Sequence, residues 1–390
     1  MWDSNVIVTG AAQTPFNRRK DGTGLRDWSA SAFADALAMA QIEPSQIDAL
    51  YVASESDFFS LQLNPSSILA SELGLTGVAA MRCEGGGASG QLAVHAATMA
   101  VQSGAARHVA VIGVDSSASS LPGGAMRKLY GFSFDAWTDG MTGFSATALY
   151  ALSWQVFAAK QGLGEAHLAA VTIQNRANAC ANLDAHLPRR DSADQIDASP
   201  MIASPYRRLH CAPLSDGAAA LILSHHSATT RRTAPRIAGI GAATDHMHLG
   251  TRADPGAFAA KRKAMQRACG VAGIVPGDIG LAEVYDAYAG AQLQALTALG
   301  LSDDVRVDLE ASAFAPGGRC PVNLSGGLMG QGAPVGATGV GQVATCARLL
   351  EGRYPSDLQP EVLPKYALAD THGGVCTSAA VTILQGRGAA

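Results

Sequence analysis

The chain has 390 residues, of which 48% are hydrophobic and 15% are charged, and its formal net charge is −4 at pH 7. This length exceeds one ordinary core and predicts two fused α/β lobes, while the small charged fraction indicates a large interior and assembly into oligomers. The negative balance, without a long basic run, argues against nucleic-acid binding as the main role, and no apolar run reaches the ~18 residues of a membrane span.

The cysteines and the start of the chain bear on the compartment. Seven cysteines, an odd number with no C-x-x-C pair, indicate reduced and mostly buried thiols. The first four residues carry no basic and apolar leader pattern. We therefore expect a cytoplasmic protein.

In chain order, short apolar runs alternate with helical stretches. Residues 5–9 and 108–114 are typical of buried parallel strands, and residues 30–40 and 91–103 of Ala-rich helices. Strands separated by helices predict a mainly parallel sheet that is covered on both faces.

Three segments recur in the same order in the two halves, which indicates a duplicated unit. The matching pairs are residues 42–52 with 274–284, 84–104 with 326–352, and 215–223 with 377–384.

This repeated order of segments predicts an N-terminal lobe at residues 1–228 and a C-terminal lobe at residues 234–390. Residues 117–208 have no counterpart in the second half, so we interpret them as an inserted loop domain over the active site.

The Gly-rich turn from Gly85 to Gly90 fits the pattern G-x-G-x-x-G between a strand and a helix. This is the dinucleotide fingerprint, but no acidic residue ends a strand about 20 residues later, which disfavours a nicotinamide cofactor. The same turn can direct N–H groups at an oxyanion on a carbonyl substrate, and glycine also suits close helix–strand packing. Because a similar turn recurs at residues 330–339, we favour a shared site over packing alone.

Five ordered blocks resemble the thiolase superfamily, in its sterol-carrier-type thiolase and lipid-transfer branch. They are residues 81–104, 204–220, 282–292 and 323–339, and the C-terminal Gly-Gly segment. The resemblance covers nearly the whole chain. It implies an α/β fold of two βαβαβαββ lobes in a five-layered arrangement, a homodimer, and an acyl-CoA substrate, with coenzyme A as part of that substrate and no separate cofactor.

The catalytic positions that the resemblance implies are changed in the first half. Where thiolases carry the nucleophilic Cys, this chain has Gly87, in the same turn as Ser89. Cys83 lies four residues earlier, in the preceding strand, and is interpreted as a core thiol. Glycine cannot form the acyl-enzyme that thiolysis requires.

The second half departs from the family in the same way. Where thiolases carry the His that activates the Cys, this chain has Ala333, followed in the turn by Gly336. The position of the second, proton-shuttling Cys falls on Thr371, and a shift of one residue would place His372 there.

A site that keeps oxyanion donors without a nucleophile suits aldol or retro-aldol chemistry beside a thioester. The resemblance to aldolases of this branch, which use tyrosines in the repurposed pocket, points to Tyr285 as the acid/base group. Asp286 would orient it, and His372 is a second candidate. The competing interpretations are a half-buried strand aromatic for Tyr285 and a histidine satisfied by backbone for His372.

Arg207 and Arg208 are candidates for the coenzyme A phosphates, although such a pair is more often solvated surface charge. The remaining histidine pairs lack consistent third and fourth ligands, so the sequence predicts no metal site.

Three functions stay open from the sequence. The first is an aldolase-type lyase that acts on an acyl-CoA by enolate stabilisation, without a Cys acyl-enzyme. The second is an acyltransferase with a non-standard active site. The third is a non-catalytic acyl-CoA-binding subunit of a complex. Relatives of this branch often pair with a small zinc-ribbon and OB-fold protein, so the resemblance also implies such an accessory partner.

Overall fold

The computed structural model describes residues 4–18, 21–354 and 357–386. The first three residues, on which the leader prediction rests, lie outside this range. No helix within the described ranges is long and apolar enough to cross a membrane.

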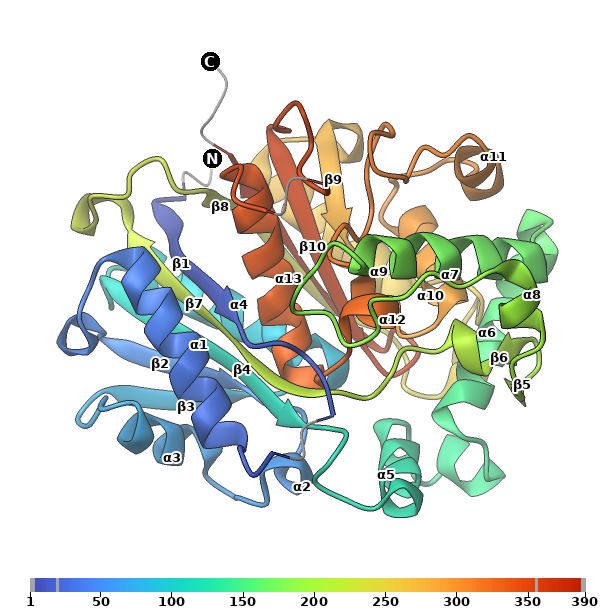
Figure 1. The fold of residues 1–390 in the computed structure, drawn as a ribbon, viewed down its shortest axis with the longest axis horizontal. Helices are drawn as coiled ribbons and strands as arrows, with labels where there is room; N and C mark the ends of the chain where they lie inside the picture. The colour runs from blue at the N-terminus through green and yellow to red at the C-terminus, as the bar shows by residue number, and fades with distance from the viewer. Residues whose placement is uncertain (1–3, 19–20, 355–356, 387–390) are drawn as a thin grey trace.

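Within the described residues, nine strands form one mixed sheet in the order β3-β2-β4-β7-β1-β8-β11-β10-β9 (Figure 1). The N-terminal half supplies β1 (Val6–Gln13), β2 (Ala49–Ala53), β3 (Ala79–Cys83), β4 (His108–Ser116) and β7 (Asp216–His225). The C-terminal half supplies β8 (Arg236–Thr244), β9 (Ile279–Glu283), β10 (Tyr366–Gly373) and β11 (Ser378–Gln385). The halves meet where β1 and β8 run antiparallel and Ile7 pairs with Arg236.

The two halves repeat one strand arrangement. In the N-terminal half, β2 is parallel to β4, β4 is antiparallel to β7, and β7 is antiparallel to β1. In the C-terminal half, β9 is parallel to β10, β10 is antiparallel to β11, and β11 is antiparallel to β8. The segments that recur in the sequence form equivalent elements: Pro44–Gln46 forms a 3-10 turn that leads into β2, and Pro276–Asp278 forms a 3-10 turn that leads into β9. The structure therefore confirms the internal duplication.

The expectation of a mainly parallel sheet is wrong. β1 is antiparallel to both of its neighbours, and β4 has one parallel and one antiparallel neighbour. The closing strand of each half, β7 or β11, returns antiparallel to the strand before it, which an apolar run alone does not reveal.

The helices and sheet halves form five layers. α1 (Leu25–Ala40) and α3 (Pro65–Glu72) cover the outer face of the N-terminal strands, and α9 (Ala259–Ala272) covers the C-terminal strands β8 and β11, with α10 (Ala289–Ala298) packed beside α9. α4 (Ser89–Gln102) and α13 (Val335–Leu350) pack against strands of both halves and so form the middle layer (Figure 1).

The middle layer explains the composition of α13. Every residue of this helix except Arg348 is buried, which fits a helix that is apolar and small all round. A Cβ atom at Gly90 of α4 would lie 2.8 Å from Gly339 of α13, so glycine at this crossing allows the two helices to touch. Packing is thus the role of these two glycines.

The inserted loop domain is built mainly of helices. It contains α5 (Gly123–Tyr130), α6 (Ala146–Gln161), α7 (Glu165–Ala179), α8 (Ala193–Asp197) and the hairpin of β5 (Met201–Ala203) with β6 (Tyr206–Arg207). α6 and α7 pack on α10 of the other half, and α7 also packs on α12 (Gly327–Gln331) (Figure 1). The insertion of one half therefore covers the C-terminal half. The remaining helices are α2 (Asp57–Ser60) and α11 (Val305–Glu310).

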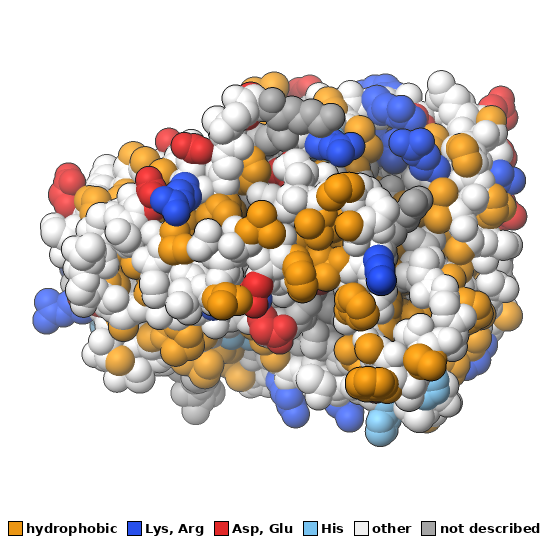
Figure 2. All heavy atoms as spheres, turned by 90° about the horizontal axis from the view of Figure 1, so that it is seen from below, with side chains coloured by type: hydrophobic (Ala, Val, Ile, Leu, Met, Phe, Trp, Pro, Cys, Tyr) orange, Lys and Arg blue, Asp and Glu red, His pale blue; other side chains and the backbone are white. Residues whose placement is uncertain are grey.

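Apolar side chains gather on the face that carries α2 and α5, at the lower edge of Figure 1 (Figure 2). Phe58, Leu61, Phe132, Trp137 and Met141 are all more than half exposed in this part of the chain.

Candidate active site

Two residues from opposite halves meet at the centre of the predicted site. Gly87 lies in the turn Gly86–Ala88 between β3 and α4, and Tyr285 follows β9. A Cβ atom at Gly87 would lie 2.5 Å from Tyr285 Oη and 2.3 Å from the carbonyl oxygen of His372. The Tyr285 ring thus occupies the space into which a side chain at position 87 would project.

Tyr285 is 6% exposed and packs with Leu328 and Ala333. Burial, followed by the charge of Glu55, raises the pKa of Tyr285 well above its ordinary value, so the hydroxyl is protonated at neutral pH. Among the described residues, no hydrogen bond is made to Tyr285 Oη. The backbone N–H of Tyr285 donates to Asp370 Oδ2. The hydroxyl is therefore a free proton donor.

His372 belongs to a buried hydrogen-bonded network. Its Nδ1 lies 3.0 Å from Lys261 Nζ, its Nε2 lies 2.9 Å from Tyr150 Oη, and Lys261 also forms an ion pair with Asp370. Because an ammonium group can only donate, Nδ1 accepts and Nε2 carries the ring proton. The Tyr150 hydroxyl donates in turn to the carbonyl of Gly374. Burial and the charge of Lys261 lower the pKa of His372 well below its ordinary value, which keeps the ring neutral.

These contacts correct the expectation that His372 is a second acid/base group. Both of its ring nitrogens are already hydrogen-bonded, and its ring packs on Tyr285 with the centroids 4.7 Å apart. Thr371 points to the opposite face, because successive strand residues alternate, and its buried hydroxyl has no hydrogen-bond partner among the described residues. Of the two register alternatives, His372 is the one beside Tyr285.

Asp286 has a different role from the expected one. Its Oδ1 accepts from the backbone N–H of Leu328 at 2.6 Å, and its Oδ2 accepts from Asn175 Nδ2 at 2.7 Å. Burial raises the pKa of Asp286 to about 8. The side chain therefore ties the start of α12 to α7 instead of orienting the Tyr285 hydroxyl.

The second Gly-rich turn does not offer free oxyanion donors. The N–H of Gly336 donates to Asp115 Oδ2 at 2.6 Å, and the N–H of Ala333 donates to Ser215 Oγ at 3.0 Å. These amides are already satisfied, because residues of the N-terminal half cap the start of α13. The expectation of an oxyanion site at Ala333 and Gly336 is therefore wrong.

The first turn keeps its place beside Tyr285. Ser89 closes it from within, since its Oγ accepts from the N–H of Gly85 at 3.0 Å and donates to the carbonyl of Gly86 at 2.7 Å. Ser89 is thus structural. The turn leads directly into α4, so the positive end of the dipole of this helix lies at Gly87.

Two charged residues near the site were not identified from the sequence. Glu55 lies two residues after the end of β2, and an acidic residue at the carboxyl end of a buried parallel strand is a signal for a binding edge. Lys261 lies on the face of α9 that also carries the buried Ala260, Ala264 and Ala268, so helical periodicity places it inside.

The buried and half-buried cysteines of the described residues do not provide an activated thiolate. Burial raises the pKa of Cys211, Cys320 and Cys376 to about 12 and that of Cys269 to about 11. Cys83, half-buried and packed against the core, also has a raised pKa, as the core interpretation expects. A nucleophilic cysteine needs the opposite shift.

The predicted coenzyme A contacts have other partners or lie in solvent. Arg207 Nε lies 3.7 Å from Glu165 Oε2, and its Nη1 donates to the carbonyl of Ser199 at 3.2 Å. Arg208 is exposed at the start of a 3-10 turn. Arg207 would have to leave Glu165 in order to pair fully with a phosphate.

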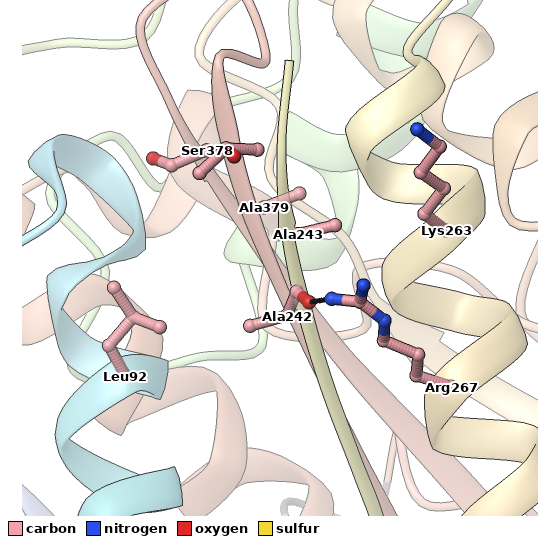
Figure 3. A pocket seen from close by; sticks show the side chains of 8 residues that line it. Leu92, Ala242, Ala243, Lys263, Arg267, Ser378 and Ala379 are labelled. Carbon is pink, nitrogen blue, oxygen red and sulfur yellow. Dashed lines mark hydrogen bonds between the residues drawn. The ribbon is translucent and has the colours of Figure 1, made fainter.

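A surface hollow lies between α4 and α9, away from Tyr285 (Figure 3). Leu92 lines one side, and Lys263 and Arg267 line the other, where Arg267 donates to the carbonyl of Ala242. Two of its lining residues reach the first turn: the Ser378 hydroxyl donates to the carbonyl of Gly85 at 2.8 Å, and the Leu92 side chain lies where a Cβ atom at Gly85 would project. In the described part of the chain, no group of three His, Cys, Asp or Glu side chains is arranged to hold a metal ion.

Comparison with known families gives the superfamily. The thiolase N-terminal domain matches residues 6–189, and the thiolase C-terminal domain-like family matches residues 241–386. An acetyl-CoA acetyltransferase of Methanothermobacter thermautotrophicus is 33% identical over 357 residues, which cover 89% of this chain and 91% of that protein. The chain belongs to the thiolase superfamily.

The sterol-carrier-type branch expected from the sequence is also confirmed. Sterol carrier protein 2 of Homo sapiens is 26% identical over 375 residues, which cover 89% of this chain and 66% of that protein. A solved structure described as an Ltp2-ChsH2(DUF35) aldolase matches with a TM-score of 0.84 and 22% identity over 100% of both chains. This match establishes the thiolase fold over the whole chain.

Proposed function

We propose that this thiolase-superfamily protein makes or breaks a C–C bond beside the carbonyl of an acyl-CoA thioester, as an aldolase-type lyase without a Cys acyl-enzyme. The observation that carries the proposal is the contact of Gly87 with Tyr285. A protonated phenol stands where a nucleophilic side chain at position 87 would project, and no thiol nearby has a lowered pKa.

In the cleavage direction the substrate is a β-hydroxyacyl-CoA. The hydroxyl loses its proton, the bond between the α and β carbons breaks, and its electron pair forms the enolate of the shorter acyl-CoA. The hydroxyl-bearing carbon leaves as an aldehyde or ketone, and a proton returns to the α carbon. No oxidant or acyl-enzyme is needed.

Three groups suit this chemistry. The start of α4 at Gly87 stabilises the developing enolate oxygen. Tyr285, kept protonated by burial, donates the proton to the α carbon. The neutral ring of His372 holds the phenol in place by packing against it.

Two comparisons support different activities. The aldolase matched by structure is described as a complex with ChsH2(DUF35), which supports both the lyase and an accessory partner. The relatives named acetyl-CoA acetyltransferase favour acyl transfer as the second candidate. Acyl transfer through an enzyme-bound intermediate requires a nucleophile, so the two candidates differ in whether a covalent adduct forms.

The test is α-proton exchange. The protein is incubated with acetyl-CoA or propionyl-CoA in deuterated water, and deuterium at the α carbon is followed by mass spectrometry. We expect uptake in the wild type and a loss of about 10²-fold or more in Tyr285→Phe, as for removal of a general acid/base. Binding of the thioester by both proteins, measured by calorimetry, is the control.

Two outcomes would contradict the lyase. A stable acyl adduct in the intact mass of the wild type would favour the acyltransferase. Binding of the thioester without any exchange, in the presence or absence of an accessory protein, would favour a binding subunit.

A further inference from the structure

The carboxylate of Glu55 lies beside the first turn, and the proposed reaction gives it no role. It follows β2, and its Oε1 lies 3.8 Å from where a Cβ atom at Gly86 would be. Its Oε2 is buried and has no hydrogen-bond partner among the described residues. A buried carboxylate oxygen left without a partner is costly unless it serves a purpose such as contact with a ligand.

The neighbours of Glu55 fix the backbone and leave the carboxylate free. The backbone N–H of Glu55 donates to Asp115 Oδ2 at 3.0 Å. Arg82 donates to the carbonyl oxygens of Ser54 and Glu55, while its ion-pair partner is Asp57. The nearby cation is thus engaged elsewhere, and the loop fixes the backbone of Glu55 without neutralising its side chain.

The titratable groups around this carboxylate come from five other segments. They are Arg82 of β3, Glu84 just before the first turn, Asp115 of β4, Tyr130 of α5 and Tyr285 after β9. Burial, then the charges of Asp115 and Glu84, raises the pKa of Glu55 to about 8. Glu55 in turn raises the pKa of Tyr285, so the two groups are electrostatically coupled.

We propose that Glu55 is a catalytic residue of the C–C lyase, the base that accepts the proton of the substrate's β-hydroxyl while Tyr285 protonates the α carbon. This inference rests on the proposed function and adds the second half of the proton transfer. Its geometric basis is a buried, unpartnered carboxylate oxygen at the same glycine turn that Tyr285 contacts from the other half of the chain.

The proton balance closes over one turnover. Ionised Glu55 takes the hydroxyl proton as the C–C bond breaks, and Tyr285 gives its proton to the enolate carbon. Protonated Glu55 then restores the proton of the Tyr285 phenolate. The net result moves one proton from oxygen to carbon, and both side chains return to their starting states.

The experiment compares Glu55→Gln with the wild type in the α-proton exchange assay over a series of pH values. In this reaction Tyr285 removes the α proton as the phenolate, after passing its own proton to ionised Glu55. We expect the wild-type rate to rise with pH and to level off above about 8, where Glu55 is ionised. Glu55→Gln should lose about 10²-fold or more in rate and lose this pH dependence. Glu84→Gln, which removes an exposed carboxylate next to the same turn, is the matched control. It should keep the rate at high pH and the pH-dependent rise, with the rise moved to lower pH because the charge of Glu84 contributes to the raised pKa of Glu55.

The outcomes separate this inference from the proposed function. If Tyr285→Phe abolishes exchange while Glu55→Gln keeps the rate or the pH profile of the wild type, Glu55 is not the base and the lyase stands. If the wild type binds the thioester without exchange, both proposals fail. Glu55→Asp, which shortens the side chain by one methylene, provides a second variant: a carboxylate there should recover part of the rate and the pH-dependent rise, and recovery of neither would count against Glu55.

Discussion

At the scale of single residues, Gly87 and Tyr285 depend on each other. They are far apart in the sequence and come from different halves, yet the space above one is filled by the ring of the other. A methyl group at position 87 would meet both the phenol and the carbonyl oxygen of His372. This crowding gives a direct test of the site geometry that does not depend on any activity.

We expect Gly87→Ala to lower the free energy of unfolding by about 1–3 kcal/mol, because the added carbon overpacks a buried site. In a Tyr285→Ala background the same substitution should be less harmful, since only the clash with the His372 carbonyl remains. Urea unfolding of the four proteins measures the difference. Gly270→Ala, on the exposed face of α9, where its Cβ would meet no atom within 4 Å, is the control and should raise the free energy of unfolding by about 0.5–1 kcal/mol, as alanine does in a helix. Equal effects of Gly87→Ala in both backgrounds would show that the phenol does not fill this space.

At the scale of elements, the start of α13 is capped from the other half of the chain. Asp115, at the end of β4, accepts from the N–H of Gly336, from Ser54 Oγ at 2.8 Å and from the N–H of Glu55. One buried carboxylate thus joins β2, β4 and α13. It fixes both the turn that carries Ala333 and the loop that carries Glu55.

We expect Asp115→Ala to lower the free energy of unfolding by about 2–3 kcal/mol, because it leaves buried donors without an acceptor. Asp115→Asn should cost less, since one acceptor oxygen remains. Asp304, which caps the exposed helix α11 through the N–H groups of Arg306 and Val307, is the comparison, and Asp304→Ala should cost only about 1 kcal/mol. If Asp115→Ala were no more destabilising than Asp304→Ala in chemical unfolding, the capping of α13 by Asp115 from the other half would stabilise the protein no more than an ordinary exposed helix cap.

The sequence allowed the elements to be predicted better than their contacts. The repeated Pro-containing turns and Gly-rich turns follow from local chemistry, and they fall where expected. The hydrogen bond that already satisfies the Gly336 N–H could not be predicted, because its acceptor Asp115 is more than 200 residues away along the chain. The same holds for His372, whose neutral, fully bonded state depends on Lys261 of another element. Motif spacing identifies the neighbourhood of the site, but the hydrogen-bond partners decide which groups remain free to react.

At the scale of the whole molecule, buried carboxyls set the pH dependence of stability near neutrality. Burial raises the pKa of Asp115 and Glu283 to about 7 and that of Glu55 and Asp286 to about 8. Unfolded carboxyls release their protons near pH 4, so between pH 4 and 8 the native state binds more protons than the unfolded chain. Stability from these groups is therefore lost as the pH rises through their folded pKa values.

We expect the free energy of unfolding to fall between pH 6.5 and 8.5. The buried histidines His95 and His210, with the pKa of each lowered to about 4, act in the opposite direction only below their ordinary pKa of 6.5. Each carboxyl contributes at most about 1.4 kcal/mol per pH unit. Urea unfolding at several pH values measures the slope, and Asp286→Asn should make it shallower. A stability that rises over this range would mean that the buried carboxyls are ionised in the native protein.

The contact between Gly87 and Tyr285 also restricts the order in which these two positions can change in evolution. A side chain at position 87 crowds the tyrosine in its present place, because the first added carbon would lie 2.5 Å from the phenol oxygen. The least strained path therefore loses the side chain at 87 before, or together with, the gain of the aromatic ring at 285. A return to a nucleophile at 87 is least strained when that ring is removed first, and the carbonyl oxygen of His372, 2.3 Å from the same carbon, must also move. Unless both positions change together, this path passes through an intermediate that has neither group, and selection must tolerate that intermediate for the site to change its chemistry.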